Sequence, residues 1–429
     1  MKSNSFLFLL SSLMMIGLWT NSTLAHEVAG KDTLRLKTEK HRGYGLLGGG
    51  FGRLDILDIS EEELLAVIPP DISEPTLGRE FVDLKLWAYE NIQNNHPEIL
   101  ERFIQENYPT KIDTANILSE RENSIRIILG MRGADSVYIV DENGNGDYRD
   151  DPVRMLEKLK YGPDAPDPEP VACHYWIYNG KELVRDSGWV LVGINAHNTI
   201  RISVAQHMTS NLSVDGQTYG FQAISWLPAA GFCFDSPNIS ITSHNGVKKD
   251  SILLSERFEL GEYLKLGDSY YRFEKMTNDG SEITLIREAD VSDKIGKQVG
   301  FIAPDFACVS TAGDSISLHD YRNEYVLLVN ITACWSEPMS YEHYKELSDK
   351  YLSKIDIVAI DASEKPLQAN IKQLKLEGTF VLSPQNRSIQ QSYREDYCSR
   401  TCFLIDPNGQ LVDKFEIYDW EEILAKHFQ

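Results

Sequence analysis

Short runs of branched and aromatic residues dominate the chain between residues 124 and 290. The first of them are 124–129 and 136–140, which are rich in the β-branched and aromatic residues that favour strands. Asn-Gly and Asp-Gly pairs, which favour tight turns, separate several runs. Many short strands with such turns predict a mainly-β, sandwich-like domain over residues 124–290. The other predicted strands are 189–192, 199–204, 219–224, 239–242, 270–273 and 283–286.

The pattern changes from residue 297 to the end. Two apolar runs, 325–330 and 355–360, are each followed by helical spacing, at 340–352 and 367–376. Two more strand-like runs surround an Asp-Pro-Asn-Gly turn, and a last helix ends the chain; these elements are 401–405, 411–417 and 420–428. The order β-α-β-α-β-β-α predicts an α/β, thioredoxin-like domain over residues 297–429.

Residues 26–123 form a glycine-rich and mixed N-terminal region. Alternation predicts a strand at 81–88, and helical spacing after a first-turn proline predicts a helix at 97–104. The glycine-rich segment 43–52 contains a literal G-x-G-x-x-G at Gly43, Gly45 and Gly48. No apolar strand precedes it and no βαβ unit follows, so we reject a dinucleotide site and predict a flexible or hairpin-forming segment.

Residues 1–25 have the pattern of a secretory signal peptide. Lys2 precedes a short apolar core, and Thr23 and Ala25 supply small residues before a cleavage point. We therefore expect a periplasmic or otherwise exported protein. No later run of about 18 apolar residues occurs, so no transmembrane span is expected after cleavage.

Charge and cysteine content narrow the function classes. The chain of 429 residues carries 42 Lys+Arg and 64 Asp+Glu, a formal net charge of −22. This acidity argues against a nucleic-acid partner, since phosphate backbones would be repelled. Six cysteines in an exported chain leave structural disulfides and thiol chemistry open.

Three motifs in the C-terminal segment point to a family. Residues 300–306 read GFIAPDF, residues 326–330 read VLLVN and residues 401–406 read TCFLID. They resemble the TlpA/ResA-like thiol-disulfide oxidoreductases of the redoxin (AhpC/TSA-type) group. The resemblance implies a thioredoxin fold and thiol-disulfide or peroxidase chemistry. Residues 26–290 are similar only to β-rich N-terminal regions of Bacteroidota redoxin-domain proteins, notably around 138–151.

The family's W-C-x-P-C motif is degenerate in this chain. The matching positions are Trp335, Ser336, Glu337, Pro338 and Met339. Serine stands at the place of the nucleophile and methionine at that of the resolving cysteine. Disulfide exchange needs a thiolate, and neither a hydroxyl nor a thioether can replace it. The sequence therefore predicts that dithiol catalysis is lost.

Two further departures surround this motif. Arg400 stands where the family has its cis-proline, and Thr332-Ala333-Cys334 is one residue short of the peroxiredoxin T-x-x-C. In the family's fold the two loops face each other, so the resemblance implies that Cys334 lies near Cys398. A structural disulfide, a relocated redox pair and free thiols all remain open for these two cysteines.

The other four cysteines are predicted to have structural roles. Cys402 and Cys308 fall in predicted strands and are expected to be small buried residues. Cys173 and Cys233 both lie in the β-rich region, where a bond between them is open.

One loop has the spacing of a calcium site. Asp141, Asn143, Asn145, Asp147 and Asp151 place oxygen ligands at alternating positions after a predicted strand. No glutamate ends the loop, so a plain hairpin turn is the alternative interpretation. No motif for an organic cofactor is present.

Two functions remain open for this chain. The first is an exported thioredoxin-fold protein related to thiol-disulfide oxidoreductases. The second is a non-catalytic binding or scaffold protein of the cell envelope, in which the β-rich domain recognises an unknown protein partner. Since one fold hosts many functions, the active-site positions must decide between them.

Overall fold

The computed structural model describes most of the chain. The described residues are 33–48, 52–83, 92–93, 97–99, 123–159, 169–179, 181–195, 198–225, 232–234, 237–253, 256–289, 291, 293–331, 339–394 and 399–428. The predicted signal peptide, residues 100–104 of the predicted helix, residues 332–338 and Cys398 lie outside them. Within the described residues, no helix is long and apolar enough to cross a membrane.

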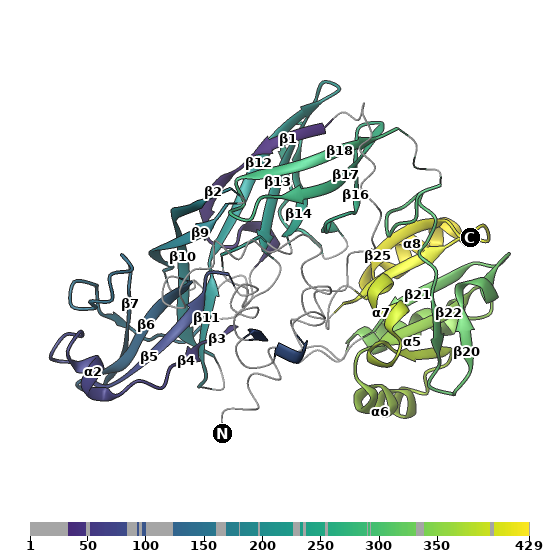
Figure 1. The fold of residues 1–429 in the computed structure, drawn as a ribbon. Coiled ribbons are helices and arrows are strands. Elements are labelled where there is room, and N and C mark those ends of the chain that lie inside the picture. The colour runs from purple at the N-terminus through teal and green to yellow at the C-terminus, as the bar shows by residue number, and fades with distance from the viewer. Residues whose placement is uncertain are drawn as a thin grey trace. The chain divides into compact units, whose positions relative to one another are not determined.

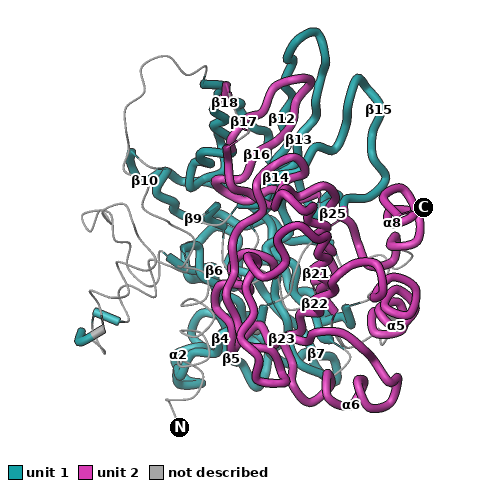
Figure 2. Tube along the Cα trace, turned by 90° about the vertical axis from the view of Figure 1, so that its right-hand side faces the viewer, with its two compact units in different colours: residues 1–252, 273–286 teal, residues 253–272, 287–429 magenta. Residues whose placement is uncertain are grey.

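The chain divides into two compact units (Figure 2). Unit 1 comprises residues 1–252 and 273–286, and unit 2 comprises residues 253–272 and 287–429. The chain therefore enters unit 2 for a short segment, returns to unit 1, and then completes unit 2.

Unit 1 is built from strands, which confirms the predicted mainly-β character (Figure 1). Its described part holds three antiparallel sheets with the orders β4-β5-β6-β7-β8, β3-β11-β10-β9 and β15-β14-β13-β12-β2. The bounds are β2 Glu39–Arg42, β3 Gly52–Arg53, β4 Asp55–Ile56, β5 Ser73–Phe81, β6 Ser124–Arg132, β7 Asp135–Val140, β8 Arg154–Met155, β9 Val171–Tyr178, β10 Leu183–Ile194, β11 Ile200–Val204, β12 Gln206–Val214, β13 Gln217–Ser225, β14 Pro237–His244 and β15 Val247–Lys248. In addition, β1 (Thr33–Lys37) pairs antiparallel with β18 (Glu282–Glu288).

Two of these sheets share one apolar core, as in a sandwich. Alternate residues of β6 and β7, such as Ile127 and Val140, pack in the same cluster as Cys173 and Ile177 of β9. The opposite face of β6 and β7 packs with Leu64 from the short helix α2 (Glu61–Leu65). Period-two alternation therefore gives each strand two buried faces in this part of unit 1.

The predicted strand at 81–88 lies mainly outside the described residues. The observed strand is β5, which ends at Phe81, and residues 84–88 lie outside the described part. Pro75 and the adjacent charged residues Arg79 and Glu80 concealed β5 in the sequence, yet Glu80 is only 5% exposed.

The glycine-rich segment is a packed turn over its described residues. Gly45 has a φ of 59° and begins the 3-10 helix η1 (Gly45–Leu47). The buried Gln222 side chain accepts a hydrogen bond from Leu46 N (3.0 Å) and donates one to Tyr44 O (2.8 Å). Leu47 is 1% exposed. These contacts exclude the flexible alternative for residues 44–47.

The larger part of unit 2 has the predicted thioredoxin-like α/β fold (Figure 1). Its five-stranded sheet has the order β23-β22-β21-β24-β25, in which β21, β22 and β23 are parallel and β24 and β25 are antiparallel to their neighbours. The strands are β21 Val326–Asn330, β22 Asp356–Asp361, β23 Thr379–Leu382, β24 Thr401–Ile405 and β25 Leu411–Glu416; the helices are α5 Met339–Tyr351, α6 Glu364–Leu374, α7 Arg387–Tyr393 and α8 Trp420–His427. A short hairpin, β19 (Ala307–Val309) and β20 (Ser315–Ser317), precedes the sheet.

Both faces of this sheet are covered, which explains why the first four residues of β21 are all apolar. Leu327 and Val329 pack in one cluster with Tyr344 of α5 and Leu424 of α8. The alternate residues Val326 and Leu328 pack in a second cluster with Tyr393 of α7. A strand buried on both faces reads as a continuous apolar run.

A hairpin from residues 253–272 belongs to unit 2. It is formed by β16 (Tyr263–Leu266) and the first residues of β17 (Ser269–Met276). The fully buried Phe301 ring lies 4.9 Å from the Tyr263 ring and 5.3 Å from the Tyr270 ring, measured between centroids. Lys297, 5% exposed, pairs with Glu262 at 3.1 Å. The hairpin thus covers the start of the thioredoxin-like segment.

Candidate active site of the thioredoxin-like domain

The predicted active-site residues belong at the carboxyl end of β21. This strand ends at Asn330, and α5 begins at Met339. Cys334, Trp335, Ser336, Glu337 and Pro338 lie between them, outside the described residues. In open α/β sheets, the loops at the carboxyl ends of parallel strands carry the functional site.

The last residue of β21, Asn330, has a buried amide side chain. Asn330 is fully buried, and its Nδ2 donates to Tyr393 O (2.7 Å) and Thr401 O (2.9 Å). Arg394 Nη1 donates to Ile360 O at 3.2 Å and reaches Asn330 Oδ1 at 3.4 Å. One side chain therefore ties β21 to the end of α7 and to the start of β24.

A second buried pair lies at the end of β22. The Tyr341 hydroxyl, near the start of α5, donates to Asp361 Oδ2, and Ser363 N donates to Asp361 Oδ1 at 3.0 Å. Burial raises the pKa of the Asp361 carboxyl, and these two hydrogen bonds oppose the rise. Asp361 therefore holds the first turn of α5 against β22 as an acceptor.

Sequence reasoning missed this polar network. Asn330 and Asp361 each end an apolar strand run, and that placement was the available signal. Their partners Tyr341 and Arg394 come from other elements of the fold, so spacing along the chain does not reveal them.

Arg400 packs against a neighbouring ring. Its guanidinium lies 5.5 Å from the centroid of the Tyr418 ring, a cation–π distance. Its carbonyl accepts a hydrogen bond from Ile417 N at 3.0 Å. Arg400, which we predicted at the position of the family's proline, is therefore held beside β24 and the end of β25.

The comparisons with known proteins match this same segment. The family model described as Redoxin matches residues 298–423. Residues 298–423 are a redoxin domain. The thioredoxin-like protein YneN of Bacillus subtilis (strain 168) is 29% identical over 127 residues, which are 28% of this chain and 72% of that protein.

Solved structures match the same part of the chain. The thioredoxin domain of a thiol-disulfide oxidoreductase from Bacteroides vulgatus is 21% identical, with a TM-score of 0.27, and the match covers 31% of this chain and 99% of that one. A thiol:disulfide interchange protein from Bacteroides sp. is 21% identical, with a TM-score of 0.26, and the match covers 30% and 89% of the two chains.

The described cysteines of the redoxin domain are buried, as predicted. Cys402 in β24 is 0% exposed, and burial, reinforced by Glu416 and Asp419, raises the pKa of its thiol well above the usual value. Burial raises the pKa of Cys308 in β19 to about 11. Both thiols are free and remain protonated near neutral pH.

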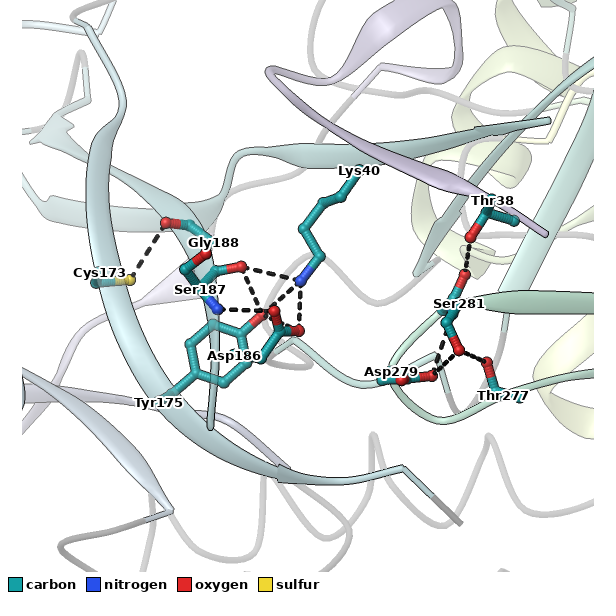
Figure 3. Close-up of polar contacts among 11 residues, drawn as sticks. Thr38, Lys40, Cys173, Tyr175, Asp186, Ser187, Gly188, Thr277, Asp279 and Ser281 are labelled. Atoms are coloured by element: carbon teal, nitrogen blue, oxygen red, sulfur yellow. Dashed lines mark hydrogen bonds and ion pairs between the residues drawn. The ribbon is translucent and has the colours of Figure 1, made fainter. Parts of the chain in front are cut away.

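The two cysteines of the β-rich unit do not form a disulfide. Cys173 and Cys233 are both buried, and no disulfide joins them. The Cys173 thiol donates to Gly188 O at 3.7 Å, and burial raises its pKa (Figure 3). In the same view, Lys40 pairs with Asp186 and donates to Ser187 O at 2.9 Å, which joins β2 to β10. The surroundings of Cys173 are those of a structural cysteine, since reactive cysteines are partly exposed and have a lowered pKa.

The predicted calcium residues lie in one loop of unit 1. Asp141 Oδ2 accepts from Gly146 N at 2.9 Å, and Asp147 pairs with Arg149 at 2.7 Å. Asp151 Oδ1 accepts from Glu142 N at 3.2 Å. Burial and the nearby Asp141 raise the pKa of Asp151 to about 6, although the Glu142 N–H lowers it. Among the described residues, no group of three or more His, Cys, Asp or Glu side chains has the arrangement of a metal site.

Proposed function

We propose that this chain is an exported redoxin-domain protein that has lost dithiol-disulfide catalysis. The observation that carries the proposal is the pair Ser336 and Met339 at the positions of the two family cysteines. A mixed disulfide requires an attacking thiolate and a second thiol that resolves it. A serine hydroxyl and a methionine thioether supply neither.

The described cysteines of the domain offer no replacement. With a pKa of about 11, roughly one Cys308 in ten thousand is a thiolate at pH 7. Burial also raises the pKa of the Cys402 thiol well above its usual value, which keeps it protonated. Both are also shielded from solvent, whereas reactive cysteines are partly exposed. Cys334 and Cys398 remain as the candidate thiols for an alternative redox role.

The retained scaffold supports a binding role. Asn330, Asp361 and Arg394 keep the end of the sheet hydrogen-bonded although the cysteines are absent. In this proposal the redoxin domain serves as a platform, and the β-rich unit recognises a protein partner in the cell envelope. Export rests on the signal-like pattern of residues 1–25.

A disulfide-reductase assay of the full chain tests the proposal. We expect the wild-type protein to reduce insulin at the background rate. We expect the double variant Ser336→Cys/Met339→Cys to exceed it by about tenfold or more, since a helix N-terminus favours a thiolate. A triple variant that adds Arg400→Pro restores the family's residue at the third position.

The matched control adds two thiols elsewhere. Ser213 and Thr218 are exposed, their hydroxyls lie 3.4 Å apart across the β12–β13 hairpin, and Ser213→Cys/Thr218→Cys should leave insulin reduction at background. Wild-type activity that disappears in Cys334→Ser would contradict the proposal and favour the relocated redox pair.

A further inference from the structure

The loop between β7 and β8 is held rigidly by the β-rich unit. Glu142 O accepts from His174 N at 2.9 Å, and Tyr148, 3% exposed, donates its backbone N–H to Val67 O at 2.9 Å. Arg154 pairs with the Glu142 carboxylate at 2.6 Å, and Arg185 donates to Asn143 O at 2.9 Å. The loop is therefore preorganised by neighbouring strands.

Within the loop, the amide side chains have a fixed orientation. Asn143 Nδ2 and Asn145 Nδ2 both donate to Asp150 Oδ2, at 3.1 and 3.0 Å. Their Oδ1 atoms accept from the backbone N–H groups of Asn145 and Asp147. An amide oxygen carries two lone pairs, so Asn143 Oδ1 can accept from Asn145 N and also face a cation.

The hydrogen bonds of the loop account for only one of the two carboxylate oxygens of Asp151. It is 8% exposed, and its Oδ2 is buried without a hydrogen-bond partner among the described residues. No described basic side chain pairs with it, because Arg149 is bound to Asp147 and Arg154 to Glu142. A buried carboxylate oxygen without a partner carries a large desolvation cost. A cation beside Asp141, 4% exposed, and Asp151 would remove that cost.

We propose that residues 141–151 bind one calcium ion through the carboxylates of Asp141 and Asp151 and the amide oxygen of Asn143. The carboxylate of Asp147 is engaged by Arg149 and has no ligand role in this proposal. Calcium suits a site of mixed carboxylate and amide oxygens with irregular geometry, whereas magnesium demands a near-ideal octahedron. Two carboxylates are few for such a site, so we expect a dissociation constant of about 0.1–1 mM, as in extracellular modules.

Calorimetric titration of the full chain with calcium chloride tests this proposal. The wild-type protein should bind one calcium ion per chain. Asp151→Asn keeps the acceptor for Glu142 N and removes the charge, so it should weaken binding by about tenfold or more. Asp141→Asn should weaken binding similarly. Circular dichroism of each variant verifies that the β-rich unit is folded.

The control variant is Asp215→Asn. Asp215 is exposed in the β12–β13 turn with a φ of 50°, a conformation that asparagine tolerates. The variant protein should therefore bind calcium as the wild type does. Absence of binding at 10 mM calcium would overturn the proposal. Binding that survives Asp151→Asn and Asp141→Asn would also overturn it, because the ion would then lie elsewhere. These outcomes do not depend on the redox assay.

Discussion

Replacement of Asn330 by alanine gives a direct measure of the network beneath the active-site position. Asn330 Nδ2 is a donor to two backbone carbonyls, Tyr393 O and Thr401 O, in an interior that water does not reach. Leaving a buried acceptor unsatisfied costs about 1–3 kcal/mol. Two carbonyls therefore predict a loss of about 2–6 kcal/mol in the free energy of unfolding.

Urea unfolding of the full chain measures this loss. The longer helices, α5 to α8, all lie in unit 2, so circular dichroism at 222 nm reports mainly on that unit. The matched control is Asn408→Ala. Asn408 is exposed in a turn of the same domain, its side chain bonds only Asp406 locally, and we expect a change below about 0.5 kcal/mol. If Asn330→Ala destabilises unit 2 no more than the control does, Asn330 does not bridge the three segments as described.

Two further predictions concern unit 1. Gly45→Ala should lower the free energy of unfolding by about 1–3 kcal/mol more than Gly216→Ala does. A Cβ at residue 45 would lie 2.2 Å from Nε2 of the hydrogen-bonded Gln222, whereas a Cβ at Gly216 meets nothing within 4 Å. Equal losses of stability in thermal unfolding would refute the packed turn. Glu80→Gln should raise the melting temperature at pH 7–8. Burial holds the pKa of Glu80 well above its usual value in the folded state, so the contribution of Glu80 to stability is fully present below about pH 4 and is lost as the pH rises. Melting curves from pH 4 to 8 should converge at low pH, and the exposed control Glu61→Gln should follow the wild type at every pH.

Local pattern predicted most of the thioredoxin-like fold because its elements are strongly periodic. The five residues of β21 are all buried, and Tyr344 and Leu347 share the buried face of α5. The short strand β23 and helix α7 were not predicted as separate elements. Each is brief, and α7 buries Ile389 and Tyr393 within an otherwise polar segment.

The β-rich unit shows where local pattern fails. Strand β9 alternates buried and exposed residues, but its exposed positions include Trp176, 42% exposed, so the run does not read as amphipathic. Strand β5 buries Glu80 and much of Arg79, and Arg79 pairs with Asp55. Long-range partners decide such burial, and local sequence carries no information about them.

The candidate sites differ in the same way. The proposed loss of both family cysteines, at Ser336 and Met339, rests on the sequence, since it depends on residue identity alone. The buried pair of Tyr341 and Asp361 depends on contact between a helix residue and a strand residue that are 20 positions apart in the chain. The unpartnered oxygen of Asp151 likewise appears only when the packing of its neighbours is known.

The hairpin at Phe301 bears on how such a protein can evolve. Strand β16 and the start of β17 belong to unit 2, whereas residues 273–286 belong to unit 1. The unit that contains the redoxin domain is therefore not one continuous segment of the chain. Excision at residue 298 would strip the rings of Tyr263 and Tyr270 from Phe301 and separate Lys297 from the domain. Recombination that exchanged only the family segment would therefore expose an aromatic core residue. If both units are inherited together, Phe301 keeps its contacts with these two rings.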